Sequence, residues 1–106
     1  MEIKEWLEST GYKVKEVRFL TPPPYPYIIF FDNTETRGAD EVNLVIDHEI
    51  FIELYSESID KVAESKIEAL LEKKAYEYTK SRDWIGSESH FQTIYEFEFI
   101  EKRRNN

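Results

Sequence analysis

The stretch that decides the fold is Leu44-Val45-Ile46-Asp47-His48-Glu49-Ile50-Phe51-Ile52-Glu53-Leu54-Tyr55. Its even-numbered residues are aliphatic apart from one histidine, whereas its odd-numbered residues mix three carboxylates with Val45, Phe51 and Tyr55. Successive side chains of a β-strand point to opposite faces of the sheet. The alternation therefore predicts a long strand over residues 44–55 with one side buried.

A helix is predicted directly after this strand. Apolar residues recur there at helical spacing, namely Ile59, Val62, Ala63, Ile67, Leu70 and Leu71. Acidic residues precede and enter the first turn, and Lys73-Lys74 stand at the end, as the helix dipole favours. Glu64, Glu68 and Glu72 form a stripe at i, i+4 spacing. We expect this stripe to be solvated, with contact to a basic partner surface as the alternative.

The other elements follow from apolar patterns and from proline and glycine. In chain order we expect a helix over residues 2–10, strands over 12–19 and 27–31, and strands over 76–85 and 93–99. The proline run from Pro22 to Pro26 cannot be helix or central strand, so it is interpreted as a stiff connector rather than as a ligand for a proline-binding domain. The order α-β-β-β-α-β-β predicts one α+β domain over residues 1–106, with a mainly antiparallel sheet and two helices packed on one face.

Residues on the apolar faces of these elements should form one core. The residues expected there are Trp6, Phe30, Ile50, Ile52, Ile67, Leu70, Leu71, Tyr95 and Phe97. Residues 33–43 lack periodicity and carry one strongly apolar side chain, which predicts a mobile hairpin loop. Residues 103–106 are expected to be a frayed tail.

Length and composition limit the class of protein. A chain of 106 residues has room for one core, and its 41% apolar share is ample to form one. No apolar run approaches the roughly 20 residues that span a bilayer, and the N-terminus lacks the pattern of a signal peptide. The chain has no cysteine, which excludes disulfides and thiolate chemistry. We therefore expect a cytosolic domain without membrane contact.

The negative charge is concentrated in one segment. The formal net charge is −8, and residues 32–60 hold nine acids against the single base Arg37. The rest of the chain is balanced, so this segment accounts for the whole excess. The domain as a whole should be repelled by nucleic acid, and no specific nucleic-acid binding is expected.

The two histidines offer no catalytic signature. His48 lies on the apolar face of its strand, without a second histidine at ligand spacing, and is interpreted as a structural histidine hydrogen-bonded in or near the core. His90 lies in a turn beside Gly86 and two serines, and no nucleophile or acid motif surrounds it.

Carboxylates are the other candidates for chemistry. Asp47, Glu49 and Glu53 share a strand face, and Glu96 and Glu98 would lie nearby if the two strands are neighbours. Such a cluster could bind a hard cation or supply an acid/base pair, but no calcium-loop spacing accompanies it, so a solvated outer face is favoured. With three glycines in the chain, no phosphate-binding loop is present either. We expect no enzymatic activity, no metal and no cofactor.

Several motifs together resemble a known family. They are the helix Ile3-Lys4-Glu5-Trp6-Leu7-Glu8-Ser9-Thr10-Gly11, the proline run leading into Pro26-Tyr27-Ile28-Ile29-Phe30, then Gly38-Ala39-Asp40, Ile52-Glu53-Leu54-Tyr55 and Tyr95-Glu96-Phe97-Glu98. In this order and spacing, over nearly the whole chain, they resemble the tail-completion proteins of long-tailed phages and prophages of Gram-positive bacteria.

The resemblance implies a structural role. Tail-completion proteins resemble tail terminators, α+β domains that form rings, commonly hexamers, at the head-proximal end of the tail tube and join it to the connector. It thus implies assembly in the host cytoplasm, a place in the virion tail, contacts with tail-tube and connector proteins, and no active-site residues.

Charge and loop composition suggest where such a ring would make its contacts. An acidic lining would repel the phosphates of passing DNA, so we expect Asp40, Glu41, Asp47, Glu49 and Glu53 to face the lumen or a partner. The predicted loop, with Thr34, Glu35, Thr36, Arg37 and Gly38, is expected to contact a neighbouring subunit.

Two other function classes stay open. An acidic inhibitor or nucleic-acid mimic would use the same negative face to bind a basic partner, as a monomer or dimer. A small-ligand or enzymatic domain would need a concave apolar pocket with converging polar groups.

Overall fold

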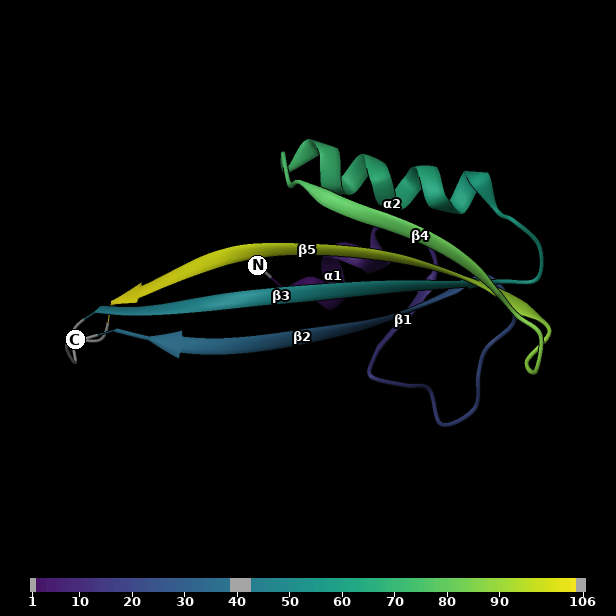
Figure 1. Ribbon diagram of the computed structural model, residues 1–106, viewed down its shortest axis with the longest axis horizontal. Coiled ribbons are helices and arrows are strands. Elements are labelled where there is room, and N and C mark those ends of the chain that lie inside the picture. The colour runs from purple at the N-terminus through teal and green to yellow at the C-terminus, as the bar shows by residue number, and fades with distance from the viewer. Residues whose placement is uncertain (1, 39–42, 105–106) are drawn as a thin grey trace.

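The computed structural model describes residues 2–38 and 43–104 and has the predicted element order (Figure 1). Its helices and strands are α1 (Ile3–Glu8), β1 (Lys13–Glu16), β2 (Tyr27–Arg37), β3 (Asn43–Ser56), α2 (Lys61–Lys73), β4 (Tyr78–Ile85) and β5 (His90–Arg104). Two helices and one five-stranded sheet confirm the α+β class.

The sheet has the strand order β1-β2-β3-β5-β4. β1 pairs with β2 in parallel, and the other three pairs are antiparallel. β3 is the central strand, and the side chains of Ile50, Ile52 and Leu54 on its even-numbered face are fully buried. The alternation over residues 44–55 therefore predicted both the strand and its buried side.

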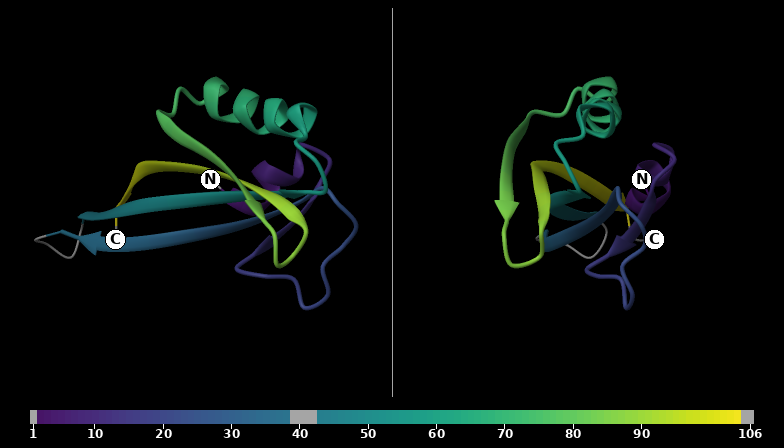
Figure 2. Two further views of the ribbon diagram at one scale, coloured as in Figure 1. Left: turned by 45° about the vertical axis from the view of Figure 1, so that its right-hand side comes forward. Right: turned by 90° about the vertical axis from the view of Figure 1, so that its right-hand side faces the viewer.

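Both helices cover the same face of this sheet. Ile3 and Leu7 from α1, and Ala63, Ile67 and Leu71 from α2, belong to one cluster with the even-numbered residues of β3. Figure 2 shows the twisted sheet curving around the two helices. Most of the predicted core is confirmed, except that Trp6 and Leu70 are only partly buried and pack against its rim.

Helix ends follow the expected local chemistry. The Asp60 carboxylate accepts a hydrogen bond from the Ala63 amide at 2.9 Å and so caps the N-terminus of α2. Gly11 follows α1 with φ +93°, the left-handed conformation expected where a helix ends. β1 is shorter than the predicted strand over 12–19, because Val17 has φ 71° and leaves strand geometry.

Two apolar residues assigned to the buried face of the second helix are exposed. Ile59 lies before the helix and is 45% exposed, and Val62 is 66% exposed. The buried stripe runs through Ala63, Ile67 and Leu71, so Val62 lies on the opposite side of the helix.

The predicted loop over 33–43 is largely strand. Residues 33–37 continue β2 and pair with β3 up to the Arg37–Val45 pair. Likewise Arg103 and Arg104 belong to β5 rather than to a frayed tail. Polar composition suggested a loop, but a strand exposed at the edge of a sheet is equally polar. Residues 39–42 and 105–106 lie outside the described residues.

Beyond the helices, β2, β3 and β5 form a three-stranded arm. It consists of residues 32–37 of β2, 43–49 of β3 and 98–104 of β5. In Figure 1 these strands run well past α2 and β4, and the molecule is 49 Å long and 22 Å thick. We call the face that continues the core the helix-side face, and the opposite face the outer face.

Candidate functional site

The arm is the candidate site, because it holds Asp47 and Glu49 and the predicted contact residues Thr34, Glu35, Thr36 and Arg37. On its helix-side face, His48 lies between two carboxylates from the flanking strands. Its Nδ1 is 2.8 Å from Asp32 Oδ1 on β2, and its Nε2 is 2.8 Å from Glu101 Oε1 on β5. The imidazole also stacks on Phe99, with 4.3 Å between ring centroids and an interplanar angle of 5°.

Strand register explains this arrangement. His48 lies opposite Thr34 on one side and Phe99 on the other, so Asp32 and Glu101 are its diagonal neighbours on the same face. A neutral imidazole has only one N–H, whereas two carboxylate acceptors call for the imidazolium, which donates from both nitrogens. Burial acts to lower the pKa of His48, but the hydrogen bonds to both carboxylates outweigh it and raise this pKa.

This node joins the three strands of the arm. A single side chain on β3 thus bridges β2 and β5 within the arm. The arrangement is that of a structural histidine, as its place on the apolar face predicted. No group of three or more histidine, cysteine or acidic side chains in the described part of the chain is arranged to hold a metal ion.

The outer face carries the predicted acidic residues. Asp47, Glu49 and Glu53 share it, and because β3 and β5 are neighbours, Glu96 and Glu98 lie on it too. Their common face was therefore predicted correctly. Asp40 and Glu41 fall outside the described residues. Whether this face lines a lumen or meets a partner stays a prediction.

Carboxylates on this face differ in their partners. Arg37 Nε lies 2.7 Å from Asp47 Oδ2, and this hydrogen bond lowers the pKa of Asp47. Glu53 accepts a hydrogen bond from the Tyr55 hydroxyl at 2.7 Å. Glu49 instead lies opposite Glu98 in the register of β3 and β5. The last pair places like charges side by side.

The residues predicted for subunit contact form an edge rather than a loop. Thr34, Glu35, Thr36 and Arg37 are exposed residues of β2, and Gly38 follows that strand directly. A contact through them would thus involve the backbone of a strand edge as well as side chains. Their contact role stays a prediction.

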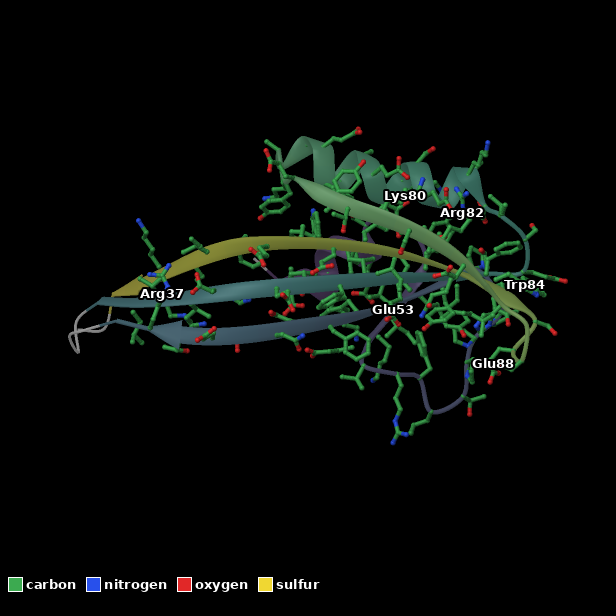
Figure 3. The ribbon with its side chains drawn as sticks, in the orientation of Figure 1. Arg37, Glu53, Lys80, Arg82, Trp84 and Glu88 are labelled. Carbon is green, nitrogen blue, oxygen red and sulfur yellow. The ribbon has the colours of Figure 1, made fainter. Side chains whose placement is uncertain are left out.

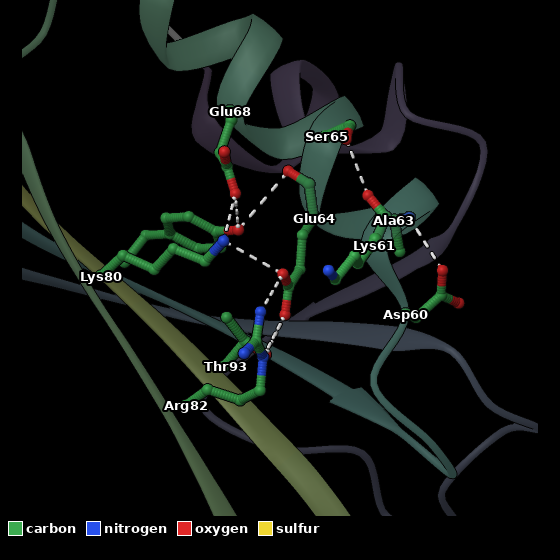
Figure 4. A network of polar contacts seen from close by, with 10 residues as sticks. Asp60, Lys61, Ala63, Glu64, Ser65, Glu68, Lys80, Arg82 and Thr93 are labelled. Carbon is green, nitrogen blue, oxygen red and sulfur yellow. Dashed lines mark hydrogen bonds and ion pairs between the residues drawn. The ribbon is translucent and has the colours of Figure 1, made fainter.

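One polar network was missed by the sequence analysis. Glu64, expected on a solvated stripe, is only 2% exposed and lies under β4 (Figure 4). Its carboxylate accepts hydrogen bonds from Arg82 at 2.6 and 2.8 Å and from the Thr93 hydroxyl at 2.9 Å. The Arg82 hydrogen bond is the main cause that lowers the pKa of Glu64 to about 2.

The neighbouring glutamate joins the same network. Lys80 Nζ lies 2.7 Å from Glu68 Oε2 and 3.0 Å from Glu64 Oε1, and the Tyr95 hydroxyl donates to Glu68 at 2.6 Å. Of the three glutamates in the stripe, Glu72 alone is exposed, Glu68 is half-buried and Glu64 is buried. The alternation of Lys80 and Arg82 on β4 was the signal for this network, because strand spacing places both on the side that faces α2.

At the end of the molecule opposite the arm, aromatic rings anchor the proline connector to the outer face. Tyr25 stacks on Tyr27 with 5.7 Å between centroids, and Tyr27 stacks on Tyr55 with 5.1 Å. The Tyr25 hydroxyl and His90 Nδ1 are 2.9 Å apart. These contacts agree with an internal connector. Figure 3 labels Arg37 on the arm and Trp84 and Glu88 at the opposite end.

A hollow lies where the arm leaves the body, and residues from both faces of the sheet line it, including His48 and Glu98. It is therefore an open surface region rather than a ligand cavity. In the same part of the chain, no helix has the length and apolar character needed to cross a bilayer.

Comparisons with known proteins show a shared fold and no sequence relative. The sequence matches no protein-family model and no curated protein. Nineteen chains of solved structures do match in fold. One is a chain of a structure described as "Virion of native gene transfer agent (GTA) particle", with a TM-score of 0.59 and 11% sequence identity. The match covers 94% of this chain and 84% of that chain, so the two share the same overall architecture.

Proposed function

We propose that this chain is a structural protein of a phage or prophage virion, and that it forms a ring at the head-proximal end of the tail tube. In this role it completes the tail and joins it to the head. The observation that carries the proposal is the fold shared, over 94% of the chain, with a chain of a gene transfer agent virion. The motif order that resembles tail-completion proteins is an independent argument for the same role.

The proposal includes the partners and the absence of catalysis. The ring, with a hexamer as the expected form, assembles in the host cytoplasm and contacts tail-tube and connector proteins. The chain acts without enzymatic activity or a cofactor. Its polar groups have structural partners instead: His48 ties the strands of the arm, and Glu64 ties α2 to β4 and β5.

The acidic outer face of the arm has a role in this scheme. DNA that passes through a head–tail junction must not adhere to its wall, and fixed carboxylates repel phosphate over a Debye length of about 10 Å at 0.1 M salt. Glu49 and Glu98 are the pair best placed for this role, since they lie directly opposite each other and neither forms an ion pair with a described residue.

Gene disruption tests the function in the source phage or lysogen. If the chain completes the tail, disruption should yield DNA-filled heads and separate tails, and supplying the chain from a plasmid should restore joined particles in electron micrographs. Joined and infectious particles in the disrupted strain would contradict the proposal. An acidic inhibitor of a basic partner would leave particle morphology intact, so the same experiment separates the two classes.

A further inference from the structure

Both outer strands of the arm have a free edge. β1 pairs with β2 only over residues 27–30, and β4 pairs with β5 only over residues 90–97. Among the described residues, no strand therefore pairs with the outer side of residues 32–37 or 98–104. Exposed edges of this kind can accept a further strand by backbone hydrogen bonding.

The two edges differ in charge. On β2, Asp32 is bound by His48 and Arg37 by Asp47, whereas the exposed Glu35 makes no ion pair with a described residue. On β5, Glu101 is bound by His48 and Arg103, whereas exposed Lys102 makes no ion pair with a described residue. On the same face of β5, the apolar side chain of Ile100 is 57% exposed, so a strand added at this edge would lie beside it.

We propose that the β5 edge of one arm pairs with the β2 edge of a second copy of this chain. The inference rests on the proposed ring and names the contact that builds it. β2 and β5 are both antiparallel to β3, so they run in the same direction and the new pair is parallel. The contact joins two different surfaces, which makes it head-to-tail, and such contacts close into rings when the rotation between copies allows.

The proposed register brings one acid of the first copy against one base of the second. Arg37 and Lys102 both lie opposite Val45, so pairing without stagger would place these two cations side by side. A stagger of two residues instead brings Glu35 of one copy against Lys102 of the next, both on the outer face. The same stagger brings Arg37, which already pairs with Asp47 of its own copy, opposite position 104. Closure of a sheet into a barrel also requires a stagger between neighbouring strands.

Cysteine cross-linking tests the pairing directly, because the natural chain contains no cysteine. Glu35→Cys and Lys102→Cys are combined in one chain, and each is also made alone. Within one copy the two positions are separated by β3, so their Cα atoms are at least about 10 Å apart, beyond the ~7 Å reach of a disulfide. Every disulfide then reports a contact between copies.

We expect the double variant to give a ladder of dimers, trimers and larger species on non-reducing gels after mild oxidation. Neither single variant should cross-link more than one tenth as much as the double variant. Dimers from Glu35→Cys alone or from Lys102→Cys alone, at the level of the double variant, would show like edges meeting and overturn the proposal. The absence of cross-links in all three variants would overturn it too.

A charge exchange gives an independent measurement. Glu35→Lys and Lys102→Glu should each weaken self-association at least tenfold in sedimentation experiments, and the combined variant should restore it, because every contact regains one acid and one base. Failure of the combined variant to recover would contradict head-to-tail pairing. In the alternative case, Glu35 and Lys102 only protect the strand edges against pairing with another chain. Both single variants would then leave the measured self-association unchanged.

These experiments distinguish an error in the edge contact from an error in the proposed function. If the natural chain forms rings but the double cysteine variant gives no ladder, the ring survives and the edge contact is wrong. If the natural chain remains monomeric at every concentration, the ring itself fails. Thermal unfolding of each variant confirms that the exposed substitutions leave the fold intact.

Discussion

Glu49 and Glu98 lie directly opposite each other on neighbouring strands of the outer face. Like charges in cross-strand opposition destabilise a sheet, so the pair does not contribute to folding. Its charge is therefore available to act on something outside the chain, and repulsion of passing phosphate is the role that the proposed function gives it.

Replacing both residues, as Glu49→Gln with Glu98→Gln, should leave the melting temperature unchanged or slightly raised, because the repulsion is removed. Nonspecific DNA binding at low salt should increase, and added salt should abolish the increase. The matched control is Glu8→Gln with Glu72→Gln, which removes the same charge from exposed positions on the helices. An equal rise in DNA binding in the control would mean that net charge, and not this face, keeps DNA away.

His48→Gln should destabilise the protein most below pH 6.5. The pKa of His48 is raised above 6.5 in the folded chain, so its charge contributes stability that is complete below that value. This contribution is lost as the pH rises through the folded-state pKa. We expect a loss of about 1 to 3 kcal/mol at pH 5.5, shrinking toward pH 9, in urea unfolding at both pH values.

The control for this prediction is His90→Gln, because the ring of His90 hydrogen-bonds the Tyr25 hydroxyl and not a carboxylate. If the loss of stability caused by His48→Gln stays constant between pH 5.5 and pH 9, His48 is not held as an imidazolium between its two carboxylate partners.

Glu64→Gln should cost about 1 to 3 kcal/mol at pH 7, since the buried carboxylate loses its charge while Arg82 and Lys80 remain beside it. The folded-state pKa of about 2 lies below the ordinary 4.5, so the contribution is complete above pH 4.5 and is lost as the pH falls toward 2. Glu72→Gln, on the exposed part of the same stripe, should change stability by less than about 0.5 kcal/mol. Equal effects of the two changes would place Glu64 in solvent.

Leu71→Ala should cost roughly 2 to 5 kcal/mol, because this side chain is fully buried between α2 and the sheet. Val62→Ala, on the exposed side of the same helix, should cost less than about 0.5 kcal/mol. Chemical denaturation of both variants measures the difference. A larger loss at Val62 would reverse the orientation of the helix.

Periodicity was enough to predict the elements and the core, because burial on one face imposes a repeat that the sequence records. It gave the central strand, the α2 stripe through Ile67 and Leu71, and the shared face of Asp47 and Glu49. Periodicity failed to predict the strand where polar side chains follow a backbone that is nevertheless hydrogen-bonded in the sheet. Residues 33–37 are polar yet paired, so composition suggested a loop.

The sequence-based predictions also missed side chains whose hydrogen-bond partners lie far away along the chain. The i, i+4 spacing of the helix predicts that Glu64 is solvated. The contact with Arg82 arises from the pairing of β4 with β5, which the local sequence does not indicate. The carboxylates that hold His48 are 16 and 53 residues away along the chain, a relation that register creates and local patterns do not contain.

Native mass spectrometry of the purified chain over a range of concentrations tests whether the chain assembles into a ring. We expect one dominant closed species at an integral multiple of the 12.7 kDa chain mass, namely the hexamer, and a ring with a central opening in negative-stain images of that species. A monomer or dimer that persists to millimolar concentration, with no larger species in the spectra and no rings in the images, would contradict it.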